Sequence, residues 1–214
     1  MTLNRSHLRT GAALVAAFAL SAPAGFLATP AVAQADAELD RAVSALRGIS
    51  TMQANFVQTD RTGRSASGVL TLKRPGRIRF QYAPGIPMLI VSDGSALTFV
   101  DYETRQVQRW PIKNSPLGAL LDPTRDVKKY GTLLSGDPAR VVIQVRDRSH
   151  PEYGTITLRF ARDAGAPGGM ELLGWTAIDA QNKQTTIALS NHRYGGAIGD
   201  NMFRFNDPRR PTRR

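Results

Sequence analysis

The strongest constraint on the fold is a two-residue alternation of apolar and polar side chains between Leu70 and Tyr82. Leu70 and Leu72 share one face of an extended segment, and beyond a turn at Pro75-Gly76 that apolar face continues with Ile78, Phe80 and Tyr82. The intervening positions Arg77, Arg79 and Gln81 are polar. A period of two is the repeat of a β-strand with one buried side. The segment therefore predicts two strands joined by a short turn.

The same alternation returns along most of the chain. It is present in Val141, Ile143 and Val145, in Ile156, Leu158 and Phe160, in Ile187 and Leu189, and in Phe203 and Phe205. The connections between these segments, at 147–149, 165–169 and 181–183, have the length of hairpin turns and are too short for crossover helices. The sequence therefore predicts an antiparallel sheet.

Two short helices are expected beside the strands. Residues 37–47 place Leu39, Val43 and Leu46 on one helical face, and residues 115–121 form a brief helix that starts at Pro116. The predicted fold class is mainly β with short helices. A long one-sided sheet with so little cover must curl over its helices to hide its apolar face.

The first 33 residues have the pattern of a cleavable secretory signal. Arg5 and Arg9 precede an apolar run, and Ala31-Val-Ala33 fits a cleavage site, so the mature chain is expected to start near Gln34. Pro23 and Pro30 interrupt the apolar segment and disfavour a retained membrane anchor. We expect a signal peptide at 1–33, one domain at 34–208 and a basic disordered tail at 209–214.

Charge and cysteine content narrow the function further. The net charge is +11, and loss of the two signal arginines lowers it to +9. A net positive charge favours anionic partners, but a protein exported from the cytoplasm is not expected to bind nucleic acid. Arginines that alternate with apolar residues fit the solvated side of a sheet. The solvated face is the main interpretation; anionic lipid headgroups and an acidic protein partner remain alternatives. The chain has no cysteine, which excludes disulfides and a thioether-linked lipid.

Several motifs together resemble the LolA family of periplasmic lipoprotein carriers. They are Asn55-Phe-Val-Gln58, Lys73-Arg74-Pro75 at the end of an alternating strand, Val91-Ser-Asp-Gly94, and the closing segment 203–208. The resemblance implies a half-barrel, that is, a curved antiparallel sheet closed by a helical lid, whose apolar cavity accepts the acyl chains of lipoproteins. It also implies loading by an inner-membrane ABC exporter of the LolCDE type. Transfer to an outer-membrane acceptor is a further possibility, and so is direct insertion of the cargo.

The residues expected to face this cavity come from the strands and from the lid. They are Leu70, Leu72, Ile78, Phe80, Tyr82, Leu97 and Phe99 on the strands, and Leu117, Leu120 and Leu121 on the lid. The apolar pattern alone is equally consistent with an ordinary dry core.

Arg74 matches the strand arginine of the family, whose implied role is to bind lid backbone carbonyls and hold the empty form closed. Arg74 lies in register with Leu70 and Leu72, and a guanidinium on an apolar face is costly unless carbonyls or carboxylates accept its hydrogen bonds. The alternative is that Arg74 ends the strand with its head group in water.

Enzymatic function finds no support in the sequence. His150 and His192 have no metal-ligand spacing, and no nucleophile motif or phosphate loop stands in the required context. Asp93-Gly94 is interpreted as a turn. No cofactor or metal is expected.

The sequence therefore predicts a soluble, monomeric periplasmic chaperone that carries lipoproteins to the outer membrane. The main alternative is a lipid-binding sensor or regulatory module of the envelope with the same half-barrel, although such modules usually carry an additional domain. An outer-membrane acceptor is disfavoured by the missing cysteine. An outer-membrane barrel is disfavoured because aromatic residues make up only 7% of the chain.

Overall fold

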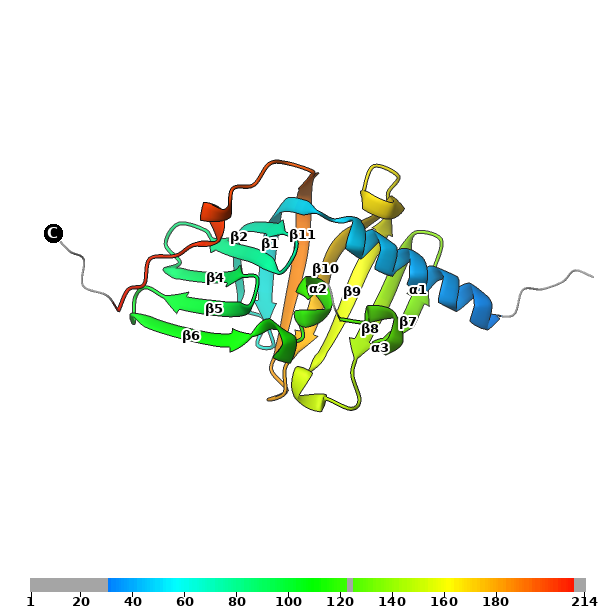
Figure 1. Cartoon of the computed structure of the whole chain (residues 1–214), viewed down its shortest axis with the longest axis horizontal. Helices are drawn as coiled ribbons and strands as arrows, with labels where there is room; N and C mark the ends of the chain where they lie inside the picture. Colours follow the sequence, from blue (N-terminus) through cyan, green and yellow to red (C-terminus); the bar gives the residue numbers. More distant parts are fainter. Residues whose placement is uncertain (1–30, 123–124, 210–214) are drawn as a thin grey trace, which may run out of the picture.

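The computed structural model describes residues 31–122 and 125–209. Within them, eleven strands form one antiparallel sheet with the order β6-β5-β4-β3-β2-β1-β11-β10-β9-β8-β7 (Figure 1). The strands are β1 Thr51–Asp60, β2 Ser65–Lys73, β3 Arg77–Tyr82, β4 Met88–Asp93, β5 Ala96–Asp101, β6 Gln106–Pro111, β7 Gly131–Gly136, β8 Arg140–Arg146, β9 Thr155–Arg162, β10 Met170–Ile178 and β11 Gln184–Tyr194. The prediction of an antiparallel sheet in a mainly β fold is confirmed.

The helices gather on one side of the sheet, which we call the inner face. Helix α1 (Ala31–Gly48) lies across the half of the sheet that contains β7 to β10, and α2 (Gly118–Leu121) stands in front of the middle (Figure 1). Helix α3 (Val127–Tyr130) lies beside α1. α1 is longer than the predicted helix at 37–47. α2 is shorter than predicted, because the chain from η1 (Ile112–Asn114) to Leu117 forms turns.

The main hydrophobic core lies between the inner face and these helices. Its largest fully buried side chains include Trp175, Phe56 and Phe160 from the sheet and Leu46 and Leu120 from the helices. Alternate residues of the inner strands point into this core, as the two-residue period requires. Both halves of the sheet contribute to a single cluster.

A second, smaller core lies on the opposite side of the sheet, which we call the outer face. There Leu89, Val91 and Val100 pack against Phe203 of the C-terminal segment. The predicted strand at 203–205 is wrong: Asp200–Phe203 forms the short 3-10 helix η4, and the chain beyond it lies in irregular conformation. The alternation of Phe203 and Phe205 instead reflects contact with an apolar patch on the sheet.

The arginines that alternate with apolar residues on the strands, and that the sequence predicts on a solvated face, include Arg79 and Arg159, and both have backbone partners. Arg79 donates from Nη1 to the carbonyl oxygens of Met202 and Arg204, at 3.1 Å and 3.0 Å. Arg159 reaches across β10 and donates to the carbonyl oxygen of Ile187 at 3.1 Å. Burial lowers the pKa of both guanidinium groups. These two half-buried side chains hold strands and the C-terminal segment together, so the solvated-face interpretation describes them only in part.

Two predicted segments fall largely outside the described residues. The signal peptide at 1–33 is described only from Ala31, where α1 begins, and the tail at 209–214 only at Arg209. In the described part of the chain, no helix combines the length and the apolar character needed to cross a membrane.

Candidate functional site

A cavity of about 560 Å³ opens on the inner face between the sheet and the chain segment 114–117. Its walls come from β3, β4, β5 and β6 on one side and from β10 and β11 on the other, and these two groups of strands flank β2 and β1 in the sheet. The apolar residues that line it are Phe80, Ile90, Leu97, Trp110, Pro116, Leu117, Trp175, Ala177, Ala180 and Ile187. A cavity of this size lies within the range of small-ligand pockets, about 300–1,000 Å³.

Aromatic rings form the floor of the cavity. The rings of Phe80 and Trp175 meet edge to face, with centroids 6.2 Å apart, and Phe56 makes similar contacts with Phe80 and Tyr82 at 5.2 Å and 5.3 Å. Such pairs are favourable beyond the area that they bury, by about 0.5–1.5 kcal/mol each. The floor is therefore a packed apolar surface.

The rim of the cavity is polar and carries both charge signs. Lys183, Glu152 and Asp179 line it together with amide side chains. Among the described residues there is no group of three or more histidine, aspartate or glutamate side chains that could hold a metal ion. An apolar interior with a mixed polar rim can shield a hydrocarbon chain while leaving an attached polar group in water.

The residues predicted to face a cavity divide into three groups. Phe80, Leu97 and Leu117 line the cavity directly. Phe99 is half-buried on the same face of β5 as Leu97. The remaining predicted residues are buried in the main core around the cavity: Leu70, Leu72, Ile78, Tyr82, Leu120 and Leu121.

Sequence reasoning missed both tryptophans of the chain. Trp175 is almost fully buried at the cavity floor, whereas Trp110 is 36% exposed at its edge. Strict alternation from Met170 and Leu172 would place Trp175 on the opposite face, and the register shift between Leu172 and Gly174 turns it inward. The one signal in the sequence is Gly174, because a glycine inside a strand often marks a bulge. Strand β6, which carries Trp110, gives no such signal because it is an exposed edge of the sheet.

Tyr82 is fixed beside the cavity floor by a hydrogen bond. Its hydroxyl donates to Oε1 of Gln58 at 2.8 Å, and Gln58 in turn lines the cavity. Burial raises the pKa of Tyr82 to about 12, although the hydrogen bond to Gln58 opposes this shift. The phenol is therefore a neutral, oriented part of the wall.

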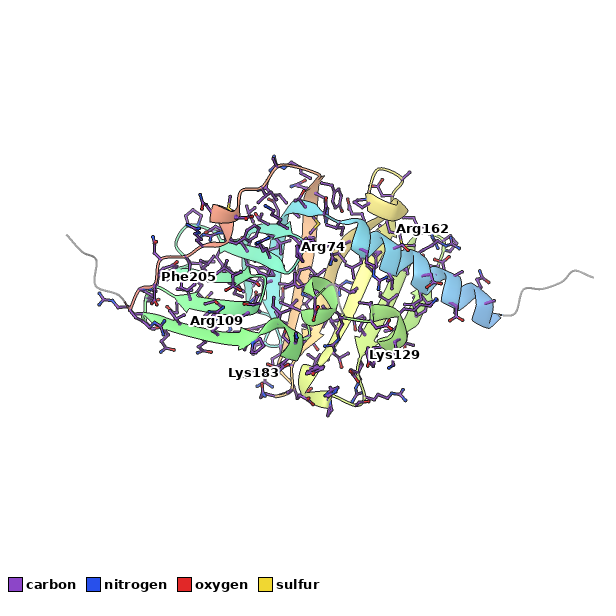
Figure 2. All side chains as sticks on the ribbon, in the orientation of Figure 1. Arg74, Arg109, Lys129, Arg162, Lys183 and Phe205 are labelled. Atoms are coloured by element: carbon purple, nitrogen blue, oxygen red, sulfur yellow. The ribbon has the colours of Figure 1, made fainter. Side chains whose placement is uncertain are left out.

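Arg74 joins the sheet to the end of α1, where the turn between β2 and β3 meets the helix (Figure 2). Its Nε donates to the carbonyl oxygen of Ile49 at 3.0 Å, and its Nη2 donates to that of Leu46 at 2.8 Å. These carbonyls belong to the C-terminal end of a helix, where backbone oxygens lack partners within the helix and the dipole favours a cation. Burial and the nearby charge of Arg47 lower the pKa of Arg74.

Other ion pairs hold α1 nearer its N-terminus. Glu38 is buried and pairs with Nη2 of Arg162 on β9 at 2.8 Å and with Arg41 one turn along the helix at 3.2 Å. On the exposed side, Lys128 of α3 pairs with Asp40 at 2.7 Å. Ion pairs therefore hold the N-terminal half of α1, and the hydrogen bonds from Arg74 to backbone carbonyls hold its C-terminal end against the sheet.

Comparison with known proteins identifies the family of the chain. Residues 47–206 match the family model described as "Outer membrane lipoprotein carrier protein LolA". An outer-membrane lipoprotein carrier protein of Xanthomonas campestris pv. campestris (strain B100) is 31% identical over 199 residues, which cover 88% of this chain and 91% of the relative. The corresponding protein of Dechloromonas aromatica is 29% identical, with coverage of 86% and 89%.

Among solved structures, a LolA superfamily protein from Nitrosomonas europaea aligns with a TM-score of 0.46 and 14% identity. The alignment covers 80% of this chain and 97% of that one. The family model covers most of the chain, and the relatives match along nearly their whole length. This chain therefore belongs to the LolA family of outer membrane lipoprotein carrier proteins.

Proposed function

We propose that this protein binds the acyl chains of lipoproteins in the inner-face cavity and carries them through the periplasm to the outer membrane. The observation that carries the proposal is the aromatic-floored cavity of about 560 Å³ in a chain of the LolA family. The proposed activity is reversible binding without covalent chemistry.

The energetics favour a carrier of this kind. Burial of each methylene group contributes about 0.8 kcal/mol, so a lipidated protein leaves a membrane very slowly unless another apolar site accepts its chains. A cavity lined by Phe80, Leu97 and Trp175 replaces one apolar environment with another, which makes transfer nearly isoenergetic. The carrier itself then needs no nucleotide site, and the energy for loading comes from an inner-membrane exporter.

We further propose that α1, α2 and α3 form a lid over the inner face and that Arg74 is its latch. The hydrogen bonds from Arg74 to Leu46 and Ile49 support this role, because they hold the end of α1 against the β2–β3 turn. When the lid opens, the leucines of α2 would separate from Leu70, Leu72 and Ile78, and the buried core would extend the cavity. A cleavable signal at 1–33 would deliver the chain to the periplasm, where it would act as a monomer and pass cargo to an outer-membrane acceptor.

The two tryptophans allow a direct test of binding. Both line the cavity, so an acyl chain that enters it should shift the intrinsic tryptophan emission of the mature protein to shorter wavelength, mainly through the half-exposed Trp110. The titration should compare an acylated lipoprotein-derived peptide with the same peptide lacking its acyl chains. Equal responses to the two peptides would contradict acyl-chain binding.

A matched pair of variants locates the binding site. Leu117→Gln places a polar group in the cavity wall and should lower the affinity for the acylated peptide at least tenfold. Leu134→Gln makes the same change at a side chain that is 53% exposed on edge strand β7, and it should leave the affinity unchanged. If both variants bind like the wild type, the acyl chains occupy some other part of the molecule.

A further inference from the structure

A second cavity, of about 200 Å³, lies between α1 and α2 and is lined by four charged and four apolar residues. Three arginines contribute to its wall: Arg47 at the end of α1, Arg74 on the β2–β3 turn and Arg125 between α2 and α3. One carboxylate, Asp122, also lines it. The remaining lining residues are apolar. The cavity reaches the surface at Arg47, which is exposed.

The charges around this cavity are unbalanced. Three guanidinium groups stand against one carboxylate and the partial negative charge at the end of α1, whose carbonyls already engage Arg74. Like charges close to one another are unfavourable, and the repulsion is stronger beside apolar walls than in water. A bound anion would relieve this repulsion.

Arg125 is positioned for such an anion. Its guanidinium stacks over the ring of Tyr153, with the central carbon 4.7 Å from the ring centroid, and its Nη1 donates to the carbonyl oxygen of Lys113 at 3.1 Å. These contacts fix the plane of the group. Its Nε is buried and has no hydrogen-bond partner among the residues that the structure describes. A buried donor of this kind is rare in folded proteins and points to a ligand.

We propose that the cavity between α1 and α2 is a binding site for a phosphate group, held by Arg47, Arg74 and Arg125. Guanidinium groups bind phosphate oxygens through paired hydrogen bonds. A tetrahedral phosphate offers acceptors in several directions and suits three arginines on three separate elements, whereas a carboxylate offers two oxygens in one plane. At roughly 30 Å³ for each water molecule, the volume holds about six waters, which is enough for a phosphate group and part of its hydration shell.

The phosphate could come from a phospholipid headgroup or from free phosphate, and two water-soluble probes separate these sources. Inorganic phosphate represents the free ion, and glycerophosphoglycerol represents the headgroup of phosphatidylglycerol without its acyl chains. Neither probe carries a hydrocarbon chain, so binding is measured independently of the acyl-chain cavity. Failure of the carrier function would leave this result unaffected.

The experiment is isothermal titration calorimetry of the mature protein at low ionic strength with each probe. We expect one equivalent to bind, with affinity reduced at least tenfold in Arg125→Gln and several-fold in Arg47→Gln, an exposed position where substitution leaves the fold intact. Arg148→Gln removes the same charge in the turn after β8 and should bind like the wild type. Tighter binding of glycerophosphoglycerol identifies a lipid headgroup, and tighter binding of inorganic phosphate identifies the free ion. If neither probe binds, or if Arg47→Gln and Arg148→Gln lose affinity equally, the proposed phosphate site is wrong.

Discussion

The guanidinium of Arg74 lies 2.8 Å from the carbonyl oxygen of Leu46, so that a charge on the sheet meets the free end of a helix 28 residues earlier in the chain. This contact is local in space and remote in sequence. It connects the strands that carry the cavity floor to the helix that covers half of the inner face. Changes at Arg74 should therefore alter how firmly α1 is held, with little effect on the strands themselves.

Arg74→Leu should shift the protein toward an open form. The substitution removes two hydrogen bonds from a charged donor, and each contributes about 1.5–3 kcal/mol. Because the site is partly open to solvent, the sum is smaller, and we expect the equilibrium between the closed and open forms to shift by roughly ten- to a hundredfold. The variant should load acylated cargo but release it more slowly, because cargo no longer competes with lid closure. Release can be measured as the loss of bound acylated peptide to acceptor vesicles.

Two further variants test whether the geometry of Arg74 matters. Arg74→Lys should restore release only partly, since an ammonium group cannot reproduce the planar fork. Arg77→Leu removes a cation from the other face of the hairpin, where the nearest carboxylate oxygen, on Asp200, is 3.9 Å away. If Arg77→Leu impairs release as much as Arg74→Leu, general basicity accounts for the effect and the latch is wrong.

Glu38→Gln should destabilise the attachment of α1 to β9. Loss of one partner from a buried pair usually costs about 3–5 kcal/mol, but Arg162 remains about a third exposed, and we expect a loss of about 2 kcal/mol. Arg41 is 56% exposed, so Arg41→Gln should cost less than about 1 kcal/mol. Urea denaturation measures both values, and similar losses in the two variants would contradict the assignment of Arg162 as the main partner.

Phe203→Ala should uncover the apolar patch on the outer face. Phe203 is 5% exposed and packs on Leu89, Val91 and Val100, so truncation of its ring should lower the free energy of unfolding by about 3 kcal/mol. Phe205 is only partly buried, and Phe205→Ala should cost clearly less. Thermal and urea denaturation provide the comparison. An unchanged midpoint for Phe203→Ala would mean that the C-terminal segment does not contribute to folding.

Stability should fall at alkaline pH through Tyr82. Its pKa is raised to about 12 in the folded protein, against about 10 in an unfolded chain, so the unfolded state loses its proton first as the pH rises. The contribution is fully present below pH 10 and is lost between pH 10 and 12, with a size of about 2.7 kcal/mol for a shift of two units. Tyr82→Phe should flatten this decline in the free energy of unfolding. Some slope should remain, because burial also raises the pKa of Tyr194 to about 12.

The local features of the fold can be predicted from the sequence. The alternation at 70–72 and 78–82 identifies strands on each side of the turn at Pro75-Gly76, and the spacing of Leu39, Val43 and Leu46 identifies the buried face of α1. The same alternation made Arg74 conspicuous as a cation in an apolar register. These features depend on residues close together in the chain, where periodicity reports which side of an element is buried.

What each buried side packs against depends on contacts between distant parts of the chain. Periodicity located neither the cavity between distant strands nor the two tryptophans that line it. It also failed at the edge strands β6 and β7, whose side chains are largely exposed and lose the alternation. At Phe203 it misled, because an apolar patch on the outer face can be covered by a short 3-10 helix as well as by a strand. Alternation records that a side chain is removed from water, and only the three-dimensional arrangement of the chain determines which residues remove it.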